Sequence, residues 1–139
     1  MIEFKNVSKV YDNGSVALDD VCLTINDGEF VLICGHSGAG KSTLFKLLTH
    51  EVVPDSGTVI VDDFDVTRMK RSKIPKLRRK LGVVFQDFRL LPNKTVSENI
   101  AFALEVIEEK PKVIKEKVSH VLELVGLTDK ANDLPEDLS

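Results

Sequence analysis

The chain has 139 residues, of which 42% are hydrophobic and 29% charged, an ordinary balance for a soluble globular protein. A chain of this length buries roughly two thirds of its unfolded surface, which is enough for one hydrophobic core. No apolar run approaches the roughly 18 residues of a membrane-spanning helix, and residues 1–5 have no signal-peptide character. These properties argue against an exported or membrane-spanning protein and favour a cytosolic one.

The net charge of −3 conceals a strongly basic segment, residues 68–80. This segment holds eight Lys or Arg and no acidic residue, and removing those eight charges from −3 leaves −11 on the rest of the chain. A basic run can bind nucleic acid or an acidic membrane surface. It can equally be a solvated helix face, so the residues alone leave its role open.

Cysteine and histidine usage gives no sign of a metal or redox site. Cys22 and Cys34 are the only cysteines and lack metal-binding spacing, so we predict buried free thiols in a reducing compartment. His36, His50 and His120 form no ligand cluster. A zinc site is therefore not expected.

The first part of the chain favours β structure. Residues 2–10 alternate as in an edge strand, residues 16–25 follow an Asn-Gly turn as the next strand, and residues 58–61 form a third. Short strands joined by tight turns predict an antiparallel sheet. The apolar runs 29–34 and 81–85 predict two further core strands.

Helical patterns occupy residues 43–48, residues 74–80 and most of the chain after residue 90. Thr95 and Glu98 have capping-box spacing, and Pro111 can open a further helix that Gly126 ends. The expected core-facing residues of these last two helices are Ile100, Ala103, Leu104, Ile107, Ile114, Val118, Val121, Leu122 and Val125. This order predicts an α/β nucleotide-binding core followed by a helical subdomain.

The residues Gly35 to Ser42 fit the phosphate-loop pattern G-x-x-x-x-G-K-[ST] in full. Its glycines let the backbone approach an anion closely, and the following helix directs its N–H groups at the same point. Lys41 would reach the β- and γ-phosphates, and the Ser42 hydroxyl would bind Mg²⁺. The alternative is a glycine-rich turn that happens to contain a lysine, which the apolar run before it and the helical pattern after it disfavour.

With these motifs the chain resembles the ATP-binding subunits of ABC transporters along its whole length. In that family an aromatic residue at the position of Tyr11 stacks on adenine, and Gln86 matches the Q-loop glutamine, which contacts Mg²⁺ and the attacking water. The resemblance implies ATP and Mg²⁺ as cofactors, catalytic roles for Lys41 and Gln86, and Ser42 and Gln86 as metal ligands. The residues implied in nucleotide binding are Tyr11, Val16, Gly35, His36, Ser37, Gly38, Ala39, Gly40, Lys41, Ser42 and Thr43.

The resemblance also implies an architecture and partners. The fold would be an α/β P-loop NTPase, an ABC-type nucleotide-binding domain with an N-terminal antiparallel β subdomain. Residues 1–89 would form that subdomain with the P-loop core, and residues 90–139 part of the helical subdomain. The expected partners are an integral membrane subunit and a second copy bound through an ATP sandwich, without nucleic acid, on the cytoplasmic face of a membrane. Residues 88–91 would be the docking surface for the membrane subunit, or else plain core packing.

Two departures from the family pattern bear on function. His36 stands where the family commonly has proline, which a cradle built from backbone should tolerate. The residues Asp137-Leu138-Ser139 fall where the family enters its signature loop, so Walker B, the catalytic glutamate and the switch histidine are expected beyond this stretch. We therefore expect residues 1–139 to form an incomplete domain that binds ATP–Mg²⁺ weakly and hydrolyses it slowly or not at all.

The residues 74–91 and 94–107 resemble most closely the family members that act in cell division. Members that drive lipoprotein or macrolide export share the loop motifs but less of this middle segment. A non-catalytic nucleotide-binding module is a further alternative. A small P-loop kinase or GTPase is disfavoured, because it would leave Tyr11 and Gln86 unexplained and no guanine-reading motif is present.

Overall fold

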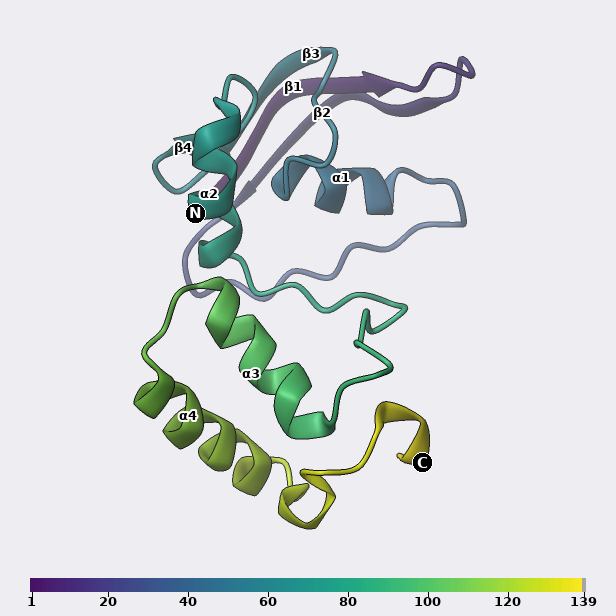
Figure 1. Ribbon diagram of the computed structural model, residues 1–139. Helices are drawn as coiled ribbons and strands as arrows, with labels where there is room; N and C mark the ends of the chain where they lie inside the picture. The colour runs from purple at the N-terminus through teal and green to yellow at the C-terminus, as the bar shows by residue number, and fades with distance from the viewer. Residues whose placement is uncertain (139) are drawn as a thin grey trace. The chain divides into compact units, whose positions relative to one another are not determined.

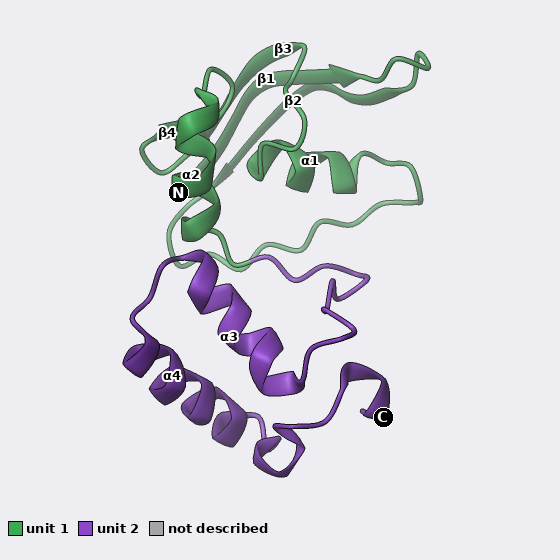
Figure 2. Ribbon diagram, in the orientation of Figure 1, with its two compact units in different colours: residues 1–82 green, residues 83–139 purple. Residues whose placement is uncertain are grey.

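The computed structural model describes residues 1–138, which divide into two compact units. The first unit comprises residues 1–82 and contains the sheet, and the second comprises residues 83–139 and is helical (Figure 2). The two units are described separately below. The predicted subdomain boundary between residues 89 and 90 stays a prediction.

The first unit is built on a four-stranded antiparallel sheet (Figure 1). Its strands are β1 (Ile2–Val10), β2 (Val16–Ile25), β3 (Ser56–Val61) and β4 (Phe64–Asp65), in the order β2-β1-β3-β4. The predicted antiparallel sheet is confirmed, but the prediction that residues 2–10 form an edge strand is wrong. Phe4 pairs with both Leu23 and Val59, so β1 is central. Alternation shows which face of a strand is buried and not how many neighbours it has.

Helices from later in the chain complete the core of this unit. Helix α1 (Lys41–Leu48) and helix α2 (Ile74–Lys80) follow the predicted ranges closely, and a short 3₁₀ turn (Arg71–Lys73) leads into α2. The buried side chains come from the sheet, the two helices and Val66: Phe4, Val7, Leu18, Leu44, Leu47, Val59, Val61, Val66 and Leu77. The start of α1 is thereby fixed against the sheet.

Two predicted strands are not formed. Neither residues 29–34 nor residues 81–85 belong to a strand, and Phe30 and Val84 are 95% and 94% exposed. A strand requires a hydrogen-bonded neighbour, and no strand among the described residues pairs with either segment. The prediction that Cys22 and Cys34 are buried is also wrong, because both free thiols are exposed. Cys34 lies in a segment that pairs with no described strand and in which Phe30 and Leu32 are also exposed.

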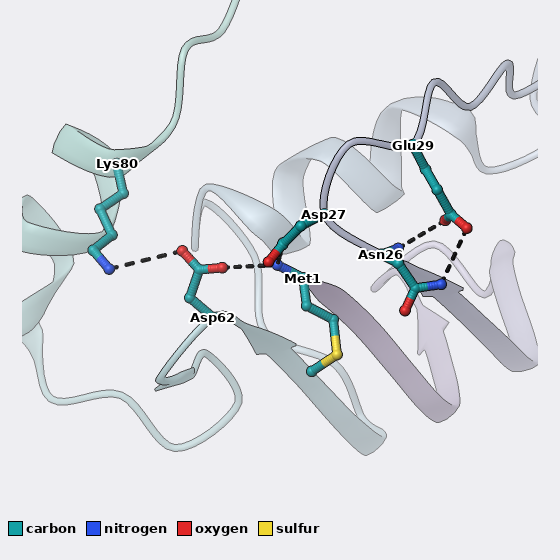
Figure 3. A network of polar contacts seen from close by, with 6 residues as sticks. All are labelled: Met1, Asn26, Asp27, Glu29, Asp62 and Lys80. Atoms are coloured by element: carbon teal, nitrogen blue, oxygen red, sulfur yellow. Dashed lines mark hydrogen bonds and ion pairs between the residues drawn. The ribbon is translucent and has the colours of Figure 1, made fainter.

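Polar contacts tie the ends of three strands together (Figure 3). The α-amino group of Met1 donates to Asp27 and, at 2.8 Å, to Asp62, whose other oxygen lies 3.7 Å from Lys80 Nζ. The hydrogen bonds to the two carboxylates raise the pKa of the amino group, and the bond to Asp27 has the larger effect. The amino group in turn lowers the pKa of Asp62. Glu29 accepts from the side chain and backbone of Asn26, which lowers its pKa. This pair holds the start of the segment that runs to the phosphate loop.

Gly57 in β3 offers a test of this packing. Its φ is +82°, and a Cβ there would lie 2.2 Å from the carbonyl oxygen of Asn6 in β1. Gly57→Ala should therefore lower the free energy of unfolding by roughly 2–5 kcal/mol, combining left-handed strain and overpacking. Chemical denaturation measures this loss. Gly28→Ala is the matched control, because Gly28 has φ +79° but open space around it and should lose only about 1–2 kcal/mol. Equal losses would contradict the close approach of β1 and β3.

The second unit consists mainly of helices α3 (Val96–Val106) and α4 (Pro111–Leu124), with 3₁₀ turns at Thr128–Lys130 and Pro135–Asp137. The predicted capping box is confirmed, with Thr95 and Glu98 bonding reciprocally. Of the predicted core-facing residues only Leu122 is buried, while Ala103, Ile107, Val121 and Val125 are exposed. The prediction that these four side chains face a core is therefore wrong, because the two helices alone do not cover them. No helix within residues 1–138 is long and apolar enough to cross a bilayer.

Candidate phosphate-binding site

The phosphate loop and the start of α1 depend on two glycines with left-handed backbone. Gly38 and Gly40 both have φ +82°, and Gly40 is the N-cap of α1. A Cβ on Gly40 would lie 2.2 Å from the carbonyl oxygen of Ala17 and 2.9 Å from the side chain of Leu18. Only glycine permits this backbone angle together with this close approach to β2. The sheet therefore fixes the position at which α1 begins.

The loop carries backbone donors that have no partner within residues 1–138. In residues 1–138, the N–H groups of Gly38, Gly40, Lys41 and Ser42 donate to no carbonyl or side chain, and no side chain caps α1. The first N–H groups of a helix need acceptors and lie at the positive end of its dipole. A run of such donors with left-handed glycines is the arrangement that binds phosphate.

Lys41 lies across the loop. Its Nζ donates to the carbonyl oxygens of Gly35 and His36, both at 2.7 Å. Carbonyl groups are neutral acceptors, and a phosphate oxygen forms a stronger, charge-assisted bond with an ammonium group. The lysine is therefore positioned at the loop and can exchange these contacts for a phosphate.

A cleft of about 580 Å³ lies beside the loop. Its wall includes Tyr11, whose hydroxyl lies 3.2 Å from Thr43 Oγ1. The lining residues are Tyr11, Ser15, Ala17, Ser37, Gly38, Ala39, Gly40, Lys41, Ser42, Thr43 and Lys46. The structure thus brings together the predicted aromatic residue and most of the predicted loop. The cleft has room for a nucleotide-sized ligand.

The end of β1 and therefore Tyr11 are held by Asp55. Its carboxylate accepts from the Val10 N–H at 2.6 Å and from Lys9 Nζ at 2.9 Å. These two hydrogen bonds lower the pKa of Asp55, and the bond from the Val10 N–H has the larger effect. A carboxyl group whose pKa is lower in the folded protein than in the unfolded chain stabilises the fold at pH values above its ordinary pKa. This stabilisation is lost as the pH falls through the pKa of the folded state. This support for Tyr11 is therefore intact at neutral pH.

Three residues predicted to bind the nucleotide lie outside the cleft lining, namely Val16, Gly35 and His36. Val16 is 61% exposed at the start of β2, and the His36 ring turns to its own loop, with Nδ1 2.7 Å from the Ser37 carbonyl oxygen. Because a carbonyl only accepts, this contact places the proton on Nδ1. The sequence reasoning missed Ser15, Ala17 and Lys46. Lys46 could have been found, since it follows Thr43 by three positions and Ser42 by four, on the same helix face.

Gln86 belongs to the second unit and is exposed. It lines a shallow pocket with Phe85, Asp87 and Arg89, in which the Arg89 guanidinium lies 3.7 Å from the Phe85 ring centroid. Two and three positions after Gln86, Phe88 and Arg89 have φ of +54° and +48°. Two successive non-glycine residues in the left-handed region are rare and strained. Phe88 is 74% exposed, so its side chain does not serve in core packing.

The donor chemistry of the cleft fits a magnesium–triphosphate group. Free backbone N–H groups and the Lys41 ammonium suit phosphate oxygens, and the exposed Ser42 hydroxyl is a hard oxygen ligand. Mg²⁺ is bound through few protein ligands together with substrate phosphates. No group of three or more His, Cys, Asp or Glu within residues 1–138 could hold a metal ion without a ligand.

The fold and the loop together define a P-loop nucleotide-binding protein. The sequence model described as "ABC transporter" matches residues 18–139, and the chain therefore belongs to the ABC transporter ATP-binding family. Its fold agrees with this assignment. The dimeric structure of the ATP-binding cassette MJ0796 bound to ADP and Pi superposes with a TM-score of 0.87 at 34% identity, over 100% of this chain and 63% of the other.

Curated relatives include cell-division proteins and importers. The cell division ATP-binding protein FtsE of Bacillus subtilis is 52% identical over 139 residues, which is all of this chain and 61% of the relative. The methionine import ATP-binding protein MetN 1 of Bacillus thuringiensis is 45% identical over 142 residues, with 42% of the relative covered. The chain thus spans about three fifths of the FtsE proteins that it matches.

Proposed function

We propose that residues 1–139 belong to an FtsE-like ABC ATPase, in which ATP binding and hydrolysis drive a conformational signal. The observation that carries this proposal is the phosphate loop, whose unpaired N–H groups and Lys41 border a cleft that also contains Tyr11. In this proposal Tyr11 stacks on adenine, the loop and Lys41 hold the phosphates, and Ser42 binds Mg²⁺. Thr43 is a further phosphate contact.

The cell-division role rests on the relatives. FtsE proteins from three genera match this chain at 49–52% identity, whereas the methionine importers match at 44–45%. We propose an FtsX-like integral membrane subunit as partner, with cell-wall hydrolysis during division as the process controlled. The protein would lie on the cytoplasmic face of the membrane. A lipoprotein or macrolide exporter remains the alternative, and a non-catalytic nucleotide module is a second one.

In this proposal the protein contacts two partners, a membrane subunit and a second copy of itself. The exposed Phe88 and Leu90 follow Gln86 by two and four positions, and we propose residues 88–91 as the docking surface for the membrane subunit. The MJ0796 cassette, which resembles this chain, is dimeric in its ADP and Pi complex. That precedent supports a second copy of the whole protein closing over the nucleotide. Gln86 would then link the docking surface to Mg²⁺ and the attacking water.

Calorimetric titration of the chain with ATP in the presence of Mg²⁺ tests the proposal. Saturable binding that requires the triphosphate and prefers ATP over GTP is expected, and absence of binding at millimolar ATP would contradict it. Steady-state turnover by residues 1–139 should be slow or absent, because this stretch would supply phosphate positioning and part of the metal shell but no general base that a motif places.

Gln86→Ala should leave ATP affinity in saturating Mg²⁺ nearly unchanged and alter its dependence on Mg²⁺ concentration. The physical reason is that the glutamine contributes a metal contact and no phosphate contact. Asn93→Ala is the matched control, since it removes an exposed amide from the same unit. If Gln86→Ala abolished ATP binding outright, the assignment of Gln86 to the Q-loop would be wrong.

A further inference from the structure

The basic segment of residues 68–80 presents unpaired positive charge at the surface. All eight of its Lys and Arg side chains are exposed. Arg78 donates to the Thr49 carbonyl oxygen at 3.0 Å, Lys80 lies near Asp62 and the Phe64 ring, and Arg79 is also engaged. The other five form no ion pair within residues 1–138, and we term them the basic surface: Arg68, Lys70, Arg71, Lys73 and Lys76.

The basic surface rests on a fixed scaffold. Leu77 is fully buried and anchors α2 in the core of the first unit, and Ile74 is half-buried one turn before it. Lys73 and Lys76 are three positions apart and project on the same side of the chain. Before them, the Asp65 carboxylate accepts from the Thr67 and Arg68 N–H groups and fixes the preceding turn. The cations are therefore presented by ordered backbone.

Three of these cations surround one pocket of about 350 Å³. Its lining consists of Asp63, Phe64, Asp65, Arg68, Met69, Lys70 and Lys73. The two carboxylates reduce the local charge, but Asp65 is already occupied with backbone N–H groups. The pocket holds three cations against two carboxylates, and Arg71 and Lys76 add positive charge outside its lining. Apolar contact is available from Phe64 and Met69. Such a surface suits a partner that is anionic and partly apolar.

The composition of the segment discriminates between anionic partners. Residues 68–80 contain no aromatic side chain on which bases could stack and no Asn or Gln to read base edges. The rest of the chain has a net charge of −11, obtained by removing these eight cations from −3, and would repel a polyanion that extends beyond the patch. A membrane surface contacts one face only, and clustered Lys and Arg are attracted to its anionic lipids.

We propose that the basic surface binds anionic lipid headgroups directly. The first unit would then have its own contact with the membrane, besides any contact through a membrane protein. None of the five cations lines the phosphate-binding cleft, so this inference stands independently of nucleotide binding. Its strength should fall steeply with ionic strength, because the attraction is electrostatic and exposed.

Flotation of the whole chain with lipid vesicles tests this inference, in the absence of nucleotide. The chain should float with vesicles of phosphatidylglycerol and phosphatidylcholine in equal amounts, and not with phosphatidylcholine alone. The triple variant Lys70→Gln, Lys73→Gln, Lys76→Gln should bind at least about tenfold more weakly. These three side chains are exposed and unpaired, so the far-ultraviolet circular dichroism spectrum and ATP affinity should be retained.

The matched control is Lys110→Gln, Lys112→Gln, Lys115→Gln, which removes the same charge from exposed, unpaired positions at the start of α4. It should bind vesicles as the unmodified chain does. Equal losses in the two triple variants, or no flotation with anionic vesicles, would overturn the proposal. The proposal would also be overturned, in favour of nucleic acid, if the chain bound a single-stranded oligonucleotide more tightly than vesicles and only the first triple variant lost that binding. A Lys41→Ala variant that binds ATP more weakly but still floats separates this surface from the nucleotide site.

Discussion

Gly40→Ala should both destabilise the first unit and abolish detectable ATP binding. The added methyl carbon would lie 2.2 Å from the Ala17 carbonyl oxygen, at a residue with φ +82°. The left-handed strain and the overpacking together should cost roughly 2–5 kcal/mol, a large part of the stability of a typical domain. Relief of the clash requires α1 to move away from β2. The phosphate loop would then lose its shape.

The control for this prediction lies in the same loop. Gly38 has the same φ of +82° but no atom within 4 Å of an added Cβ, so Gly38→Ala should lose only about 1–2 kcal/mol. Thermal denaturation of the two variants measures the difference. If both variants melted at the same temperature, the contact between the helix start and β2 would not be what requires glycine at position 40.

Lys41→Ala should weaken ATP binding while leaving the fold intact. Within residues 1–138 the side chain makes two hydrogen bonds, both to carbonyl oxygens of its own loop, so its removal exposes no buried group. A charge-assisted bond to phosphate is worth about 1.5–3 kcal/mol, which corresponds to roughly 10- to 150-fold in the dissociation constant. Calorimetric titration with Mg²⁺-ATP measures this change.

Lys112→Ala is the control for the lost charge, because Lys112 is exposed on α4 and has no partner within residues 1–138. It should bind ATP as the unmodified chain does. Unchanged affinity in Lys41→Ala would refute the interpretation of the loop as a phosphate cradle. A loss shared by both variants would show that net charge, rather than the position of Lys41, governs the affinity.

Local sequence signals predicted the elements that are formed by local interactions. The capping box at Thr95 and Glu98 depends on residues three positions apart, and α2 occupies residues 74–80 as expected. The phosphate loop could be recognised for the same reason, since its glycines, lysine and serine lie within eight residues. The sequence also placed Tyr11 with this loop, but only through a family resemblance.

What the sequence could not predict depends on neighbours that are distant in the chain. The runs 29–34 and 81–85 are apolar enough for strands, but a strand also needs a partner, and none pairs with them within the described residues. Cys34, at the end of the first of these runs, is exposed as well. The contact of Gly40 with Ala17 was equally invisible, because spacing along the chain does not show which strand passes beside a loop.

Amide chemical shifts on addition of Mg²⁺-ATP test the central claim most directly, because the claim concerns individual N–H groups. The amides of Gly38, Gly40, Lys41 and Ser42, which have no acceptor inside residues 1–138, should shift strongly and saturably, whereas those of α4 should not move. ADP should shift the same amides, and AMP should have little effect. Shifts confined to the second unit, or loop amides that stay in place at millimolar ATP, would contradict the assignment of this loop as the nucleotide site.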